Sequence, residues 1–231
     1  MSTVRGARER ARAEVTAAIK DEARRQLAAE GAARLSLRAV ARELGMVSSA
    51  LYRYFPSRDD LLTALIIDAY DAVGAAAEAA HARSDHRSGL ACWVGVSAAV
   101  RTWALDHPHE YALIYGSPVP GYSAPQDTVG PASRTALTLI AVCREAYVSR
   151  GMALPLLPEQ LAPEAQRMAA DFAPDLPPAV VAALVAAWAQ LVGLVSFEVF
   201  GQFHRVVEER EAFFSYAAAQ LGVSVGLLGE V

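Results

Sequence analysis

The stretch LRAVARELGMVSSALYRY, residues 37–54, decides how the N-terminal part of this chain folds. Val40 and Leu44 lie one helical turn apart, and Ala41 is small enough for a second helix to approach closely. Gly45 can adopt the left-handed backbone conformation that a tight turn between two helices demands. The first half of the stretch therefore predicts a short helix that ends at a glycine turn.

The second half of the stretch predicts another short helix, over 48–54, anchored on the first by Leu51 and Tyr54. We expect Ser48 to cap this helix and Val47–Arg53 to project outward. A helix pair of this spacing also occurs in proteins that bind no nucleic acid. The distribution of charge along the chain is therefore used as a second indication of what the pair binds. Residues 1–58 carry 12 basic and 6 acidic side chains, a balance of +6, whereas the remainder carries 9 and 19, a balance of −10. A basic front on an acidic body indicates that the first quarter of the chain binds a polyanion, although the arginines would also serve to solvate a helix.

Helical periodicity continues through the rest of the chain, and no stretch alternates in the manner of a strand. A helix over 7–30 has Val15, Ala18, Ile19, Ala23 and Leu27 as its apolar stripe. Ser57 and Asp60 form a capping box for a helix that runs to about His81, with its own apolar stripe at Leu61, Leu62, Leu65, Ile66, Ala69 and Val73. Further helices are predicted at 88–106, 109–115, 128–150, 159–171, 178–203 and 208–228. The predicted fold class is all-α.

Composition restricts the class of protein further. Hydrophobic residues make up 54% of the chain and charged residues 20%, which excludes a disordered chain and allows a large core. Cys92 and Cys143 are too few for a disulfide scaffold and indicate a reducing compartment. The N-terminal segment lacks the apolar region of a signal peptide, so we expect a cytoplasmic protein.

The segment Leu176–Phe197 contains no charged residue and is long enough to span a membrane. Its alanine content, Gln190 and the absence of a basic flank favour a helix that is buried by its own domain and by a second subunit. We therefore expect no membrane association. Instead we expect a homodimer through the helices at 178–203 and 208–228, with Val195, Phe213, Phe214, Ala217 and Leu221 in the interface.

The sequence contains none of the motifs GxxxxGK, GxGxxG, GxSxG or HExxH, so it supports no enzyme and no cofactor. The run DHPHE, Asp106–Glu110, gathers side chains that bind metals. Its spacing is not that of a helical pair of ligands, and Pro108 explains it equally well as a boundary between two helices. We expect no metal site.

The segment LSLRAVARELGMVSSALYRYFPSRDDLLTAL, residues 35–65, resembles the N-terminal DNA-binding domain of TetR-type transcriptional regulators. The resemblance extends back through the helix at 7–30. WALDHPHEYALIYGSPVPGY (103–122) and AWAQLVGLVSFEVFG (187–201) are similar, more weakly, to the ligand-binding and dimerising C-terminal domain of that family. The resemblance implies a helix-turn-helix DNA-binding domain at 1–58 and a helical ligand-binding and dimerisation domain at 59–231.

DNA-binding roles follow from this resemblance. Small side chains at Val47 and Ser49 suit approach to base edges, whereas hydroxyls and guanidinium groups suit phosphates. Family members often carry histidine where Tyr54 stands and lysine where Arg58 stands, and both replacements still donate to a phosphate. The predicted DNA-binding residues are Ser36, Val47, Ser48, Ser49, Tyr52, Arg53, Tyr54 and Arg58, with Arg5 and Arg8 as a flexible arm. For Tyr52 and Tyr54 a packing role is the alternative.

Aromatic residues concentrate on helices that would enclose the middle of the second domain. We expect a cavity there for a small apolar or weakly cationic effector, with a solid core as the alternative. The predicted ligand-binding residues are Trp103, His107, Tyr111, Tyr115, Cys143 and Trp188.

The sequence thus predicts a homodimeric repressor that binds a palindromic double-stranded DNA operator and is released by a small-molecule effector. The alternative is a helical small-molecule- or metal-binding protein whose basic N-terminus binds a protein partner. Salt dependence of duplex binding distinguishes the two, because phosphate contacts weaken steeply as salt rises.

Overall fold

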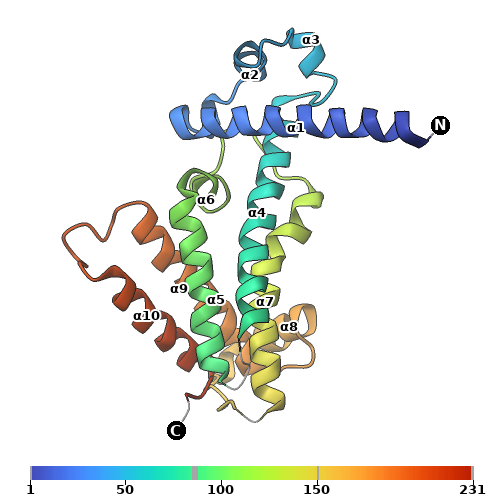
Figure 1. The fold of residues 1–231 in the computed structure, drawn as a ribbon. Helices are drawn as coiled ribbons and strands as arrows, with labels where there is room; N and C mark the ends of the chain where they lie inside the picture. Colours follow the sequence, from blue (N-terminus) through green and yellow to red (C-terminus); the bar gives the residue numbers. More distant parts are fainter. Residues whose placement is uncertain (1, 85–87, 150, 230–231) are drawn as a thin grey trace. The chain divides into compact units, whose positions relative to one another are not determined.

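The computed structural model describes residues 2–84, 88–149 and 151–229 (Figure 1). Across these residues the chain forms helices and connecting loops, so the all-α prediction is confirmed. A single antiparallel bridge joins Met152 to Leu227. Arg150, at the end of the helix predicted over 128–150, lies outside the described residues.

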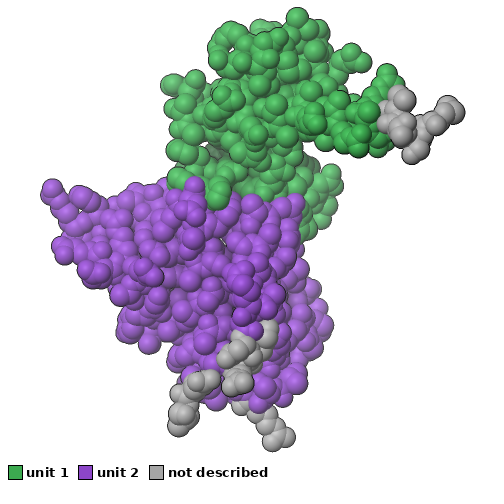
Figure 2. Space-filling model, viewed as in Figure 1, with its two compact units in different colours: residues 1–70, 107–131 green, residues 71–106, 132–231 purple. Residues whose placement is uncertain are grey.

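The helices pack into two compact units (Figure 2). Unit 1 contains residues 1–70 and 107–131, and unit 2 contains residues 71–106 and 132–231. The division that the sequence predicts after residue 58 falls inside unit 1. The first turns of the following helix contribute Leu61, Leu62 and Leu65 to the same core as the N-terminal helices.

Unit 1 is an N-terminal helical cluster that surrounds one apolar core. It contains α1 (Ser2–Glu30), α2 (Leu37–Glu43), α3 (Ser48–Leu51), the first half of α4 (Arg58–Arg83) and α6 (Pro108–Tyr115). Figure 1 shows α2 and α3 on one side of the long α1. Ile19, Ala23 and Leu27 of α1 are buried in the core as predicted, but Ala18 is exposed and does not belong to the stripe. The predicted apolar stripe of α4 is buried at all six positions.

Local signals in the sequence set the start of α4. The Ser57 hydroxyl accepts a hydrogen bond from the backbone N–H of Asp60 at 3.1 Å and donates one to the Asp60 carboxylate at 2.7 Å. Asp59 and Asp60 also place negative charge in the first turn, where the helix dipole favours it. The predicted cap at Ser57 is therefore confirmed, although the Asp60 carboxylate bonds to the Ser57 hydroxyl and not to the Ser57 backbone N–H as in a full capping box.

Unit 2 is built from longer helices around a second core. It contains the rest of α4, α5 (Gly89–Asp106), most of α7 (Val129–Val148), α8 (Ala162–Phe172), α9 (Pro178–Val199) and α10 (Arg210–Val225). Trp93 of α5 is fully buried, and its indole N–H donates to the backbone oxygen of Ala218 in α10 at 3.0 Å. Gly222 lets α10 approach this ring, because a Cβ at that position would lie 2.9 Å from the Trp93 side chain.

A charged pair links three helices of unit 2. The Arg101 guanidinium of α5 donates two hydrogen bonds, of 2.6 and 2.7 Å, to the Glu198 carboxylate of α9. It also lies over the ring of Phe214 in α10, 5.3 Å from the ring centroid. The Glu198 side chain is only 4% exposed, so its charge depends on Arg101 for compensation.

α9 is long and apolar enough to cross a membrane, judged by length and composition alone. A helix buried within a folded domain passes the same test. Here one side of α9 is buried in unit 2, through residues that include Val181, Leu184 and Leu191, and a third of its apolar window is buried in all.

The Arg101–Glu198 pair gives the first prediction. Arg101→Met leaves the buried Glu198 carboxylate without a partner, so the free energy of unfolding should fall by about 3–5 kcal/mol. Combining Arg101→Met with Glu198→Leu removes both charges and should restore most of that loss. Urea unfolding followed by circular dichroism measures both variants. A double variant as unstable as Arg101→Met alone would contradict this account of the pair.

Candidate nucleic-acid interface

The junction between α2 and α3 has the geometry of a helix-turn-helix. The Ser36 hydroxyl caps α2 by accepting from the backbone N–H of Ala39 at 3.4 Å. At the other end Gly45 has φ +65°, and its N–H bonds to the oxygen of Arg42 while that of Met46 bonds to the oxygen of Ala41. This pair of bonds is a Schellman motif, which satisfies the last carbonyls of α2 and turns the chain toward α3.

The inner side of α3 is fixed by packing. Leu51 is fully buried and joins Val40 and Ala41 of α2 in the core, with Phe55 next to them. α3 ends at Leu51, earlier than the predicted residue 54, because Arg53 and Tyr54 bond to carbonyls three residues back, as in a tightened turn. The predicted capping role of Ser48 is wrong: Val47 occupies the N-cap position, and no side chain caps this helix.

The outer side of α3 and the residues at its two ends include most of the predicted DNA-binding residues. Val47 is 70% exposed and Tyr52 42% exposed, and Ser49 and Arg53 are also exposed. Ser36 and Ser48 are half-buried. The fold therefore presents small side chains, a phenol and a guanidinium together on one short helix and its ends, which is the combination that base-edge and phosphate contacts require.

Two predicted residues, Tyr54 and Arg58, already have protein partners. Tyr54 is half-buried against the core, and the Arg12 guanidinium of α1 lies 5.3 Å from its ring centroid. Arg58 donates to the backbone oxygens of Ala32, at 2.8 Å, and Leu35, at 3.2 Å. Arg58 thus ties the start of α4 to the loop before α2, a link that no local sequence signal indicates.

The N-terminal helix differs from the flexible arm that the sequence suggested. α1 begins at Ser2, so the backbone at both Arg5 and Arg8 is helical. The side chain of Arg5 lies outside the described residues. Arg8 is exposed on this helix.

Several basic residues of unit 1 are neutralised within the unit. Lys20 pairs with Asp68 of α4 at 2.8 Å, and Arg24 bonds to Asp21, to Asp68 and to Glu110 of α6 at 2.7, 2.7 and 3.0 Å. These pairs could not be read from the sequence, because Asp68 and Glu110 are remote from α1 along the chain. They connect α1, α4 and α6 and reduce the number of cations available to an external polyanion.

The predicted ligand-binding residues are divided between the two units. Trp103, Cys143 and Trp188 belong to unit 2, where Trp103 and Cys143 are buried and Trp188 is half-buried. His107, Tyr111 and Tyr115 belong to unit 1, where Tyr111 is buried, Tyr115 is half-buried and His107 is exposed at the start of α6.

Tyr70, which the sequence did not single out, joins the aromatic residues of unit 1. Its ring packs edge-on against Tyr115, with centroids 6.0 Å apart, and its hydroxyl donates to the oxygen of Ile114 at 3.3 Å. The Tyr111 ring is also close to Tyr115, with the two centroids 5.1 Å apart. Burial raises the pKa of Tyr70 and of Tyr115 above the ordinary value, so both phenols are neutral hydrogen-bonding groups at physiological pH.

Cys143 is a core residue of unit 2. It is fully buried, and burial raises the pKa of its thiol to about 12. A thiol of that kind is inert toward oxidants and metals at neutral pH. Within the described ranges, no group of three or more His, Cys, Asp or Glu side chains is placed to hold a metal ion.

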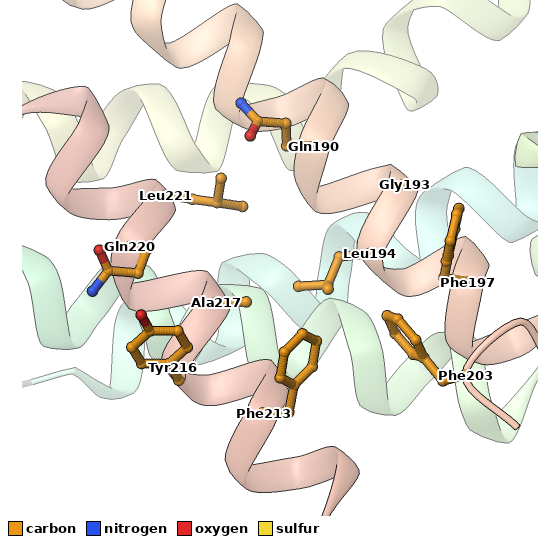
Figure 3. Close-up of a pocket in the computed structure, with 10 residues that line it drawn as sticks. All are labelled: Gln190, Gly193, Leu194, Phe197, Phe203, Phe213, Tyr216, Ala217, Gln220 and Leu221. Atoms are coloured by element: carbon orange, nitrogen blue, oxygen red, sulfur yellow. The ribbon is translucent and has the colours of Figure 1, made fainter. Parts of the chain in front are cut away.

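An apolar groove of about 520 Å³ runs between α9 and α10 in unit 2 (Figure 3). Its aromatic walls are Phe197 and Phe203 with Phe213 and Tyr216, and Gln190 and Gln220 are the polar groups at its edge. The Phe197 side chain is 53% exposed and that of Tyr216 64% exposed. We call this surface the α9–α10 groove.

The groove corrects two expected interface residues. Val195 and Phe214 are 1% and 2% exposed and face the core of their own unit, so neither is available to a second chain. Phe213, Ala217 and Leu221 line the groove, and their place in a dimer interface stays a prediction. Residues 178–197 of α9 contain no charged side chain, so periodicity could not distinguish the inner from the outer side of this helix.

Replacing glycine by alanine should have opposite effects on stability at Gly45, in the turn, and at Gly95, in a helix. Gly45→Ala should destabilise the protein by about 1 kcal/mol, because a Cβ strains the left-handed conformation although nothing lies within 4 Å of it. Gly95→Ala, in the exposed middle of α5 with equal free space, should instead stabilise it by about 0.5–1 kcal/mol. Urea unfolding compares the two. Equal effects of the two substitutions would show that the turn does not require glycine.

Comparison with known proteins agrees with this geometry. Residues 19–65 match the family of bacterial regulatory proteins described as the tetR family, and residues 93–221 match the tetracyclin repressor-like C-terminal domain. The HTH-type transcriptional regulator Rv1816 of Mycobacterium tuberculosis is 40% identical over 201 residues, which cover 86% of each chain.

Two solved structures extend the agreement to the fold. The regulatory protein SCO4313 is 36% identical, has a TM-score of 0.77, and aligns over 92% of this chain and 97% of its own. A tetR-family regulatory protein from Rhodococcus RHA1 shares the fold, with a TM-score of 0.64 at 16% identity over 93% of this chain and 98% of its own. The relatives are transcriptional regulators rather than enzymes. This chain belongs to the TetR family of DNA-binding transcriptional regulators.

Proposed function

We propose that this chain is a cytoplasmic, ligand-responsive repressor that binds a palindromic operator as a homodimer. The observation that carries the proposal is the outward side of α3 and its two ends. Ser49 is exposed on the helix, Val47, Tyr52 and Arg53 are exposed beside its ends, and the inner side of the helix is fixed in the core. The surplus of basic residues in the first quarter of the chain supplies the electrostatic attraction that DNA binding requires.

Each predicted contact residue has a role that fits its exposure. Ser49 and Val47 approach base edges in the major groove, where their small size lets α3 enter deeply. Tyr52, Ser48 and Ser36 donate to phosphates, and Arg53 reaches a guanine or a phosphate. Tyr54 contributes the hydroxyl at the edge of its stacked ring.

Arg58 is assigned a supporting role as well as its proposed phosphate contact. Its bonds to Ala32 and Leu35 fix the loop that leads into α2, and so fix the position of Ser36. The third nitrogen, Nη1, lies 3.4 Å from the Asp59 carboxylate, so in the proposed contact a DNA phosphate shares this end of the guanidinium with Asp59.

The second chain of the dimer is proposed to cover the α9–α10 groove. An apolar groove with four aromatic walls is unfavourable in water, and a two-fold copy offers the same surface in return. The partner's α9 and α10 would complete a four-helix interface over residues 178–203 and 208–228. Pairing would also cover the side of α9 that its own unit leaves open.

Effector response is proposed to reach the DNA-binding helices through α4 and α6. Arg24 and Lys20 of α1 bond to Asp68 of α4, and Arg24 bonds to Glu110 of α6, so a shift of either helix is transmitted to α1. Within unit 2, the predicted effector residues Trp103, Cys143 and Trp188 favour an apolar or weakly cationic effector.

Genomic DNA selection tests the proposed function. Fragments retained by the purified protein are sequenced, and the affinity for the recovered site is measured at increasing salt. A repressor should retain fragments that share one inverted repeat, and log affinity should fall linearly with log salt. Retention of unrelated fragments with no salt dependence would favour the alternative, a protein partner for the basic N-terminus.

Substitutions at Ser49 of α3 and at Tyr52, which follows the helix, distinguish contacts to base edges from contacts to phosphates. Ser49→Ala should weaken operator binding by about 1–3 kcal/mol and leave binding to random DNA unchanged, because it removes a base-edge contact. Tyr52→Phe should weaken binding to both duplexes equally, because a phosphate contact carries no sequence information. Fluorescence anisotropy measures each affinity. If both variants bind both duplexes like the wild type, α3 is not the reading helix.

Two substitutions of exposed phenylalanines, one inside the α9–α10 groove and one outside it, test the dimer. Phe197→Glu places a charge in the α9–α10 groove, where burial by a second chain would cost several kcal/mol, so the variant should sediment as a monomer and lose operator affinity. Phe172→Glu is the matched control, since Phe172 is 55% exposed on α8 and lies outside the groove. It should remain dimeric. A dimeric Phe197→Glu protein would place the interface elsewhere.

A further inference from the structure

The N-terminal turns of α1 form a feature that the family match does not cover. The matched domain begins at residue 19, whereas α1 begins at Ser2. Figure 1 shows these turns running on past the short α3 toward the N-terminus. Residues 2–18 carry four arginines and two glutamates. An exposed, basic helical extension therefore accompanies the DNA-binding helices.

A groove of about 530 Å³ lies where this extension meets the end of the reading helix. Arg8, Glu9, Ala11, Arg12 and Val15 of α1 line one side of it, and Tyr54 lines the other. Tyr54 is attached directly to α3, since its backbone N–H bonds to the oxygen of Leu51 at 2.8 Å. The groove is therefore continuous with the proposed DNA-binding surface.

The Arg12 guanidinium is oriented by Tyr54. It lies over the Tyr54 ring, 5.3 Å from the ring centroid, in a cation–π contact. Val15 packs against the core beside it, so the base of the groove is apolar and fixed. A planar donor held in this way is suited to a phosphate or carboxylate.

Charge in the groove favours an anion. Arg8 and Arg12 lie one turn apart on the same side of α1, where like charges repel, and Glu9 is the one carboxylate among the residues that line the groove. Deeper in α1, Lys20, Arg24 and Arg25 are each paired with a carboxylate. In contrast, neither Arg8 nor Arg12 forms an ion pair with any side chain that the structure describes. These two guanidinium groups are available to an external anion.

We propose that the groove formed by Arg8, Arg12 and Tyr54 binds a phosphate of the DNA backbone beside the segment that α3 reads. The proposal rests on the proposed DNA-binding function and deepens it. The anion nearest to a groove that adjoins a DNA-reading helix is the backbone of the same duplex. The helical extension then provides a second, rigid contact to the DNA backbone in each protomer, in place of a flexible arm.

Salt dependence of binding to a 30-bp random-sequence duplex tests the groove, because a phosphate contact acts on any sequence. Arg12→Ala should make the slope of log affinity against log salt shallower by about 0.9 per lost contact, or about 1.8 for a dimer with two grooves. Arg12→Lys should keep the wild-type slope. Arg10→Ala is the matched control: it removes the same charge from the same helix, but Arg10 is exposed and does not line the groove.

The possible outcomes distinguish failure of the proposed DNA-binding function from failure of the proposed phosphate groove. A wild-type protein that bound no duplex even at low salt would overturn the DNA-binding function and the groove with it. Wild-type binding with identical slopes for Arg12→Ala and Arg10→Ala would overturn the groove alone. Thermal unfolding confirms that each variant is folded. If Arg12→Ala unfolds early, Arg8→Ala provides the same comparison from the other guanidinium of the groove.

Discussion

The packing of Leu51 against Val40 and Ala41 is the constraint on which the DNA-binding surface depends. This contact forms only if the chain reverses within a few residues after α2, and the left-handed conformation at Gly45 makes that reversal possible. Because Leu51 fixes the inner side of α3, the side chains of Val47, Ser49 and Tyr52 point to solvent. The ends of the same segment are held by Arg58, whose guanidinium binds two backbone oxygens of the preceding loop. Rigid presentation of a few small and polar side chains is what recognition in the major groove requires.

Signals that act over a few residues were readable in the sequence. The caps at Ser36 and Ser57, the glycine turn and the apolar stripe of α4 are each local, and the structure contains all of them. The short length of α3 and the missing side-chain cap at Ser48 were not readable, because turn bonds after Leu51 compete with helical ones over a single turn. Long-range pairs such as Arg24 with Glu110 or Arg101 with Glu198 lie beyond any local pattern. Arginine and carboxylate residues are too common in the sequence for spacing to match them.

α9 shows where hydrophobic periodicity stops being informative. Residues 178–197 contain no charged side chain, so the same residues were compatible with a membrane span, a buried core helix or an interface helix. The structure separates its two sides: Val195 packs inward, whereas Phe197 contributes to the α9–α10 groove. The division of the predicted effector residues between two units has a similar origin. The sequence shows where the aromatic residues lie along the chain, but it does not show which compact unit each of them packs into. Tyr70 was recognised as part of the aromatic cluster only from its contacts with Tyr115 and Ile114.

The central claim is that two copies of α3, related by dimer symmetry, read successive major grooves of one duplex. Hydroxyl-radical footprinting of the protein on a fragment selected from genomic DNA tests it most directly, because the cleavage pattern records backbone protection at single-nucleotide resolution. The account predicts two protected blocks related by a two-fold axis, with centres separated by about one helical turn or a multiple of it, roughly 10 bp each. A single protected block, or uniform cleavage at a salt concentration where the complex is formed, would contradict it.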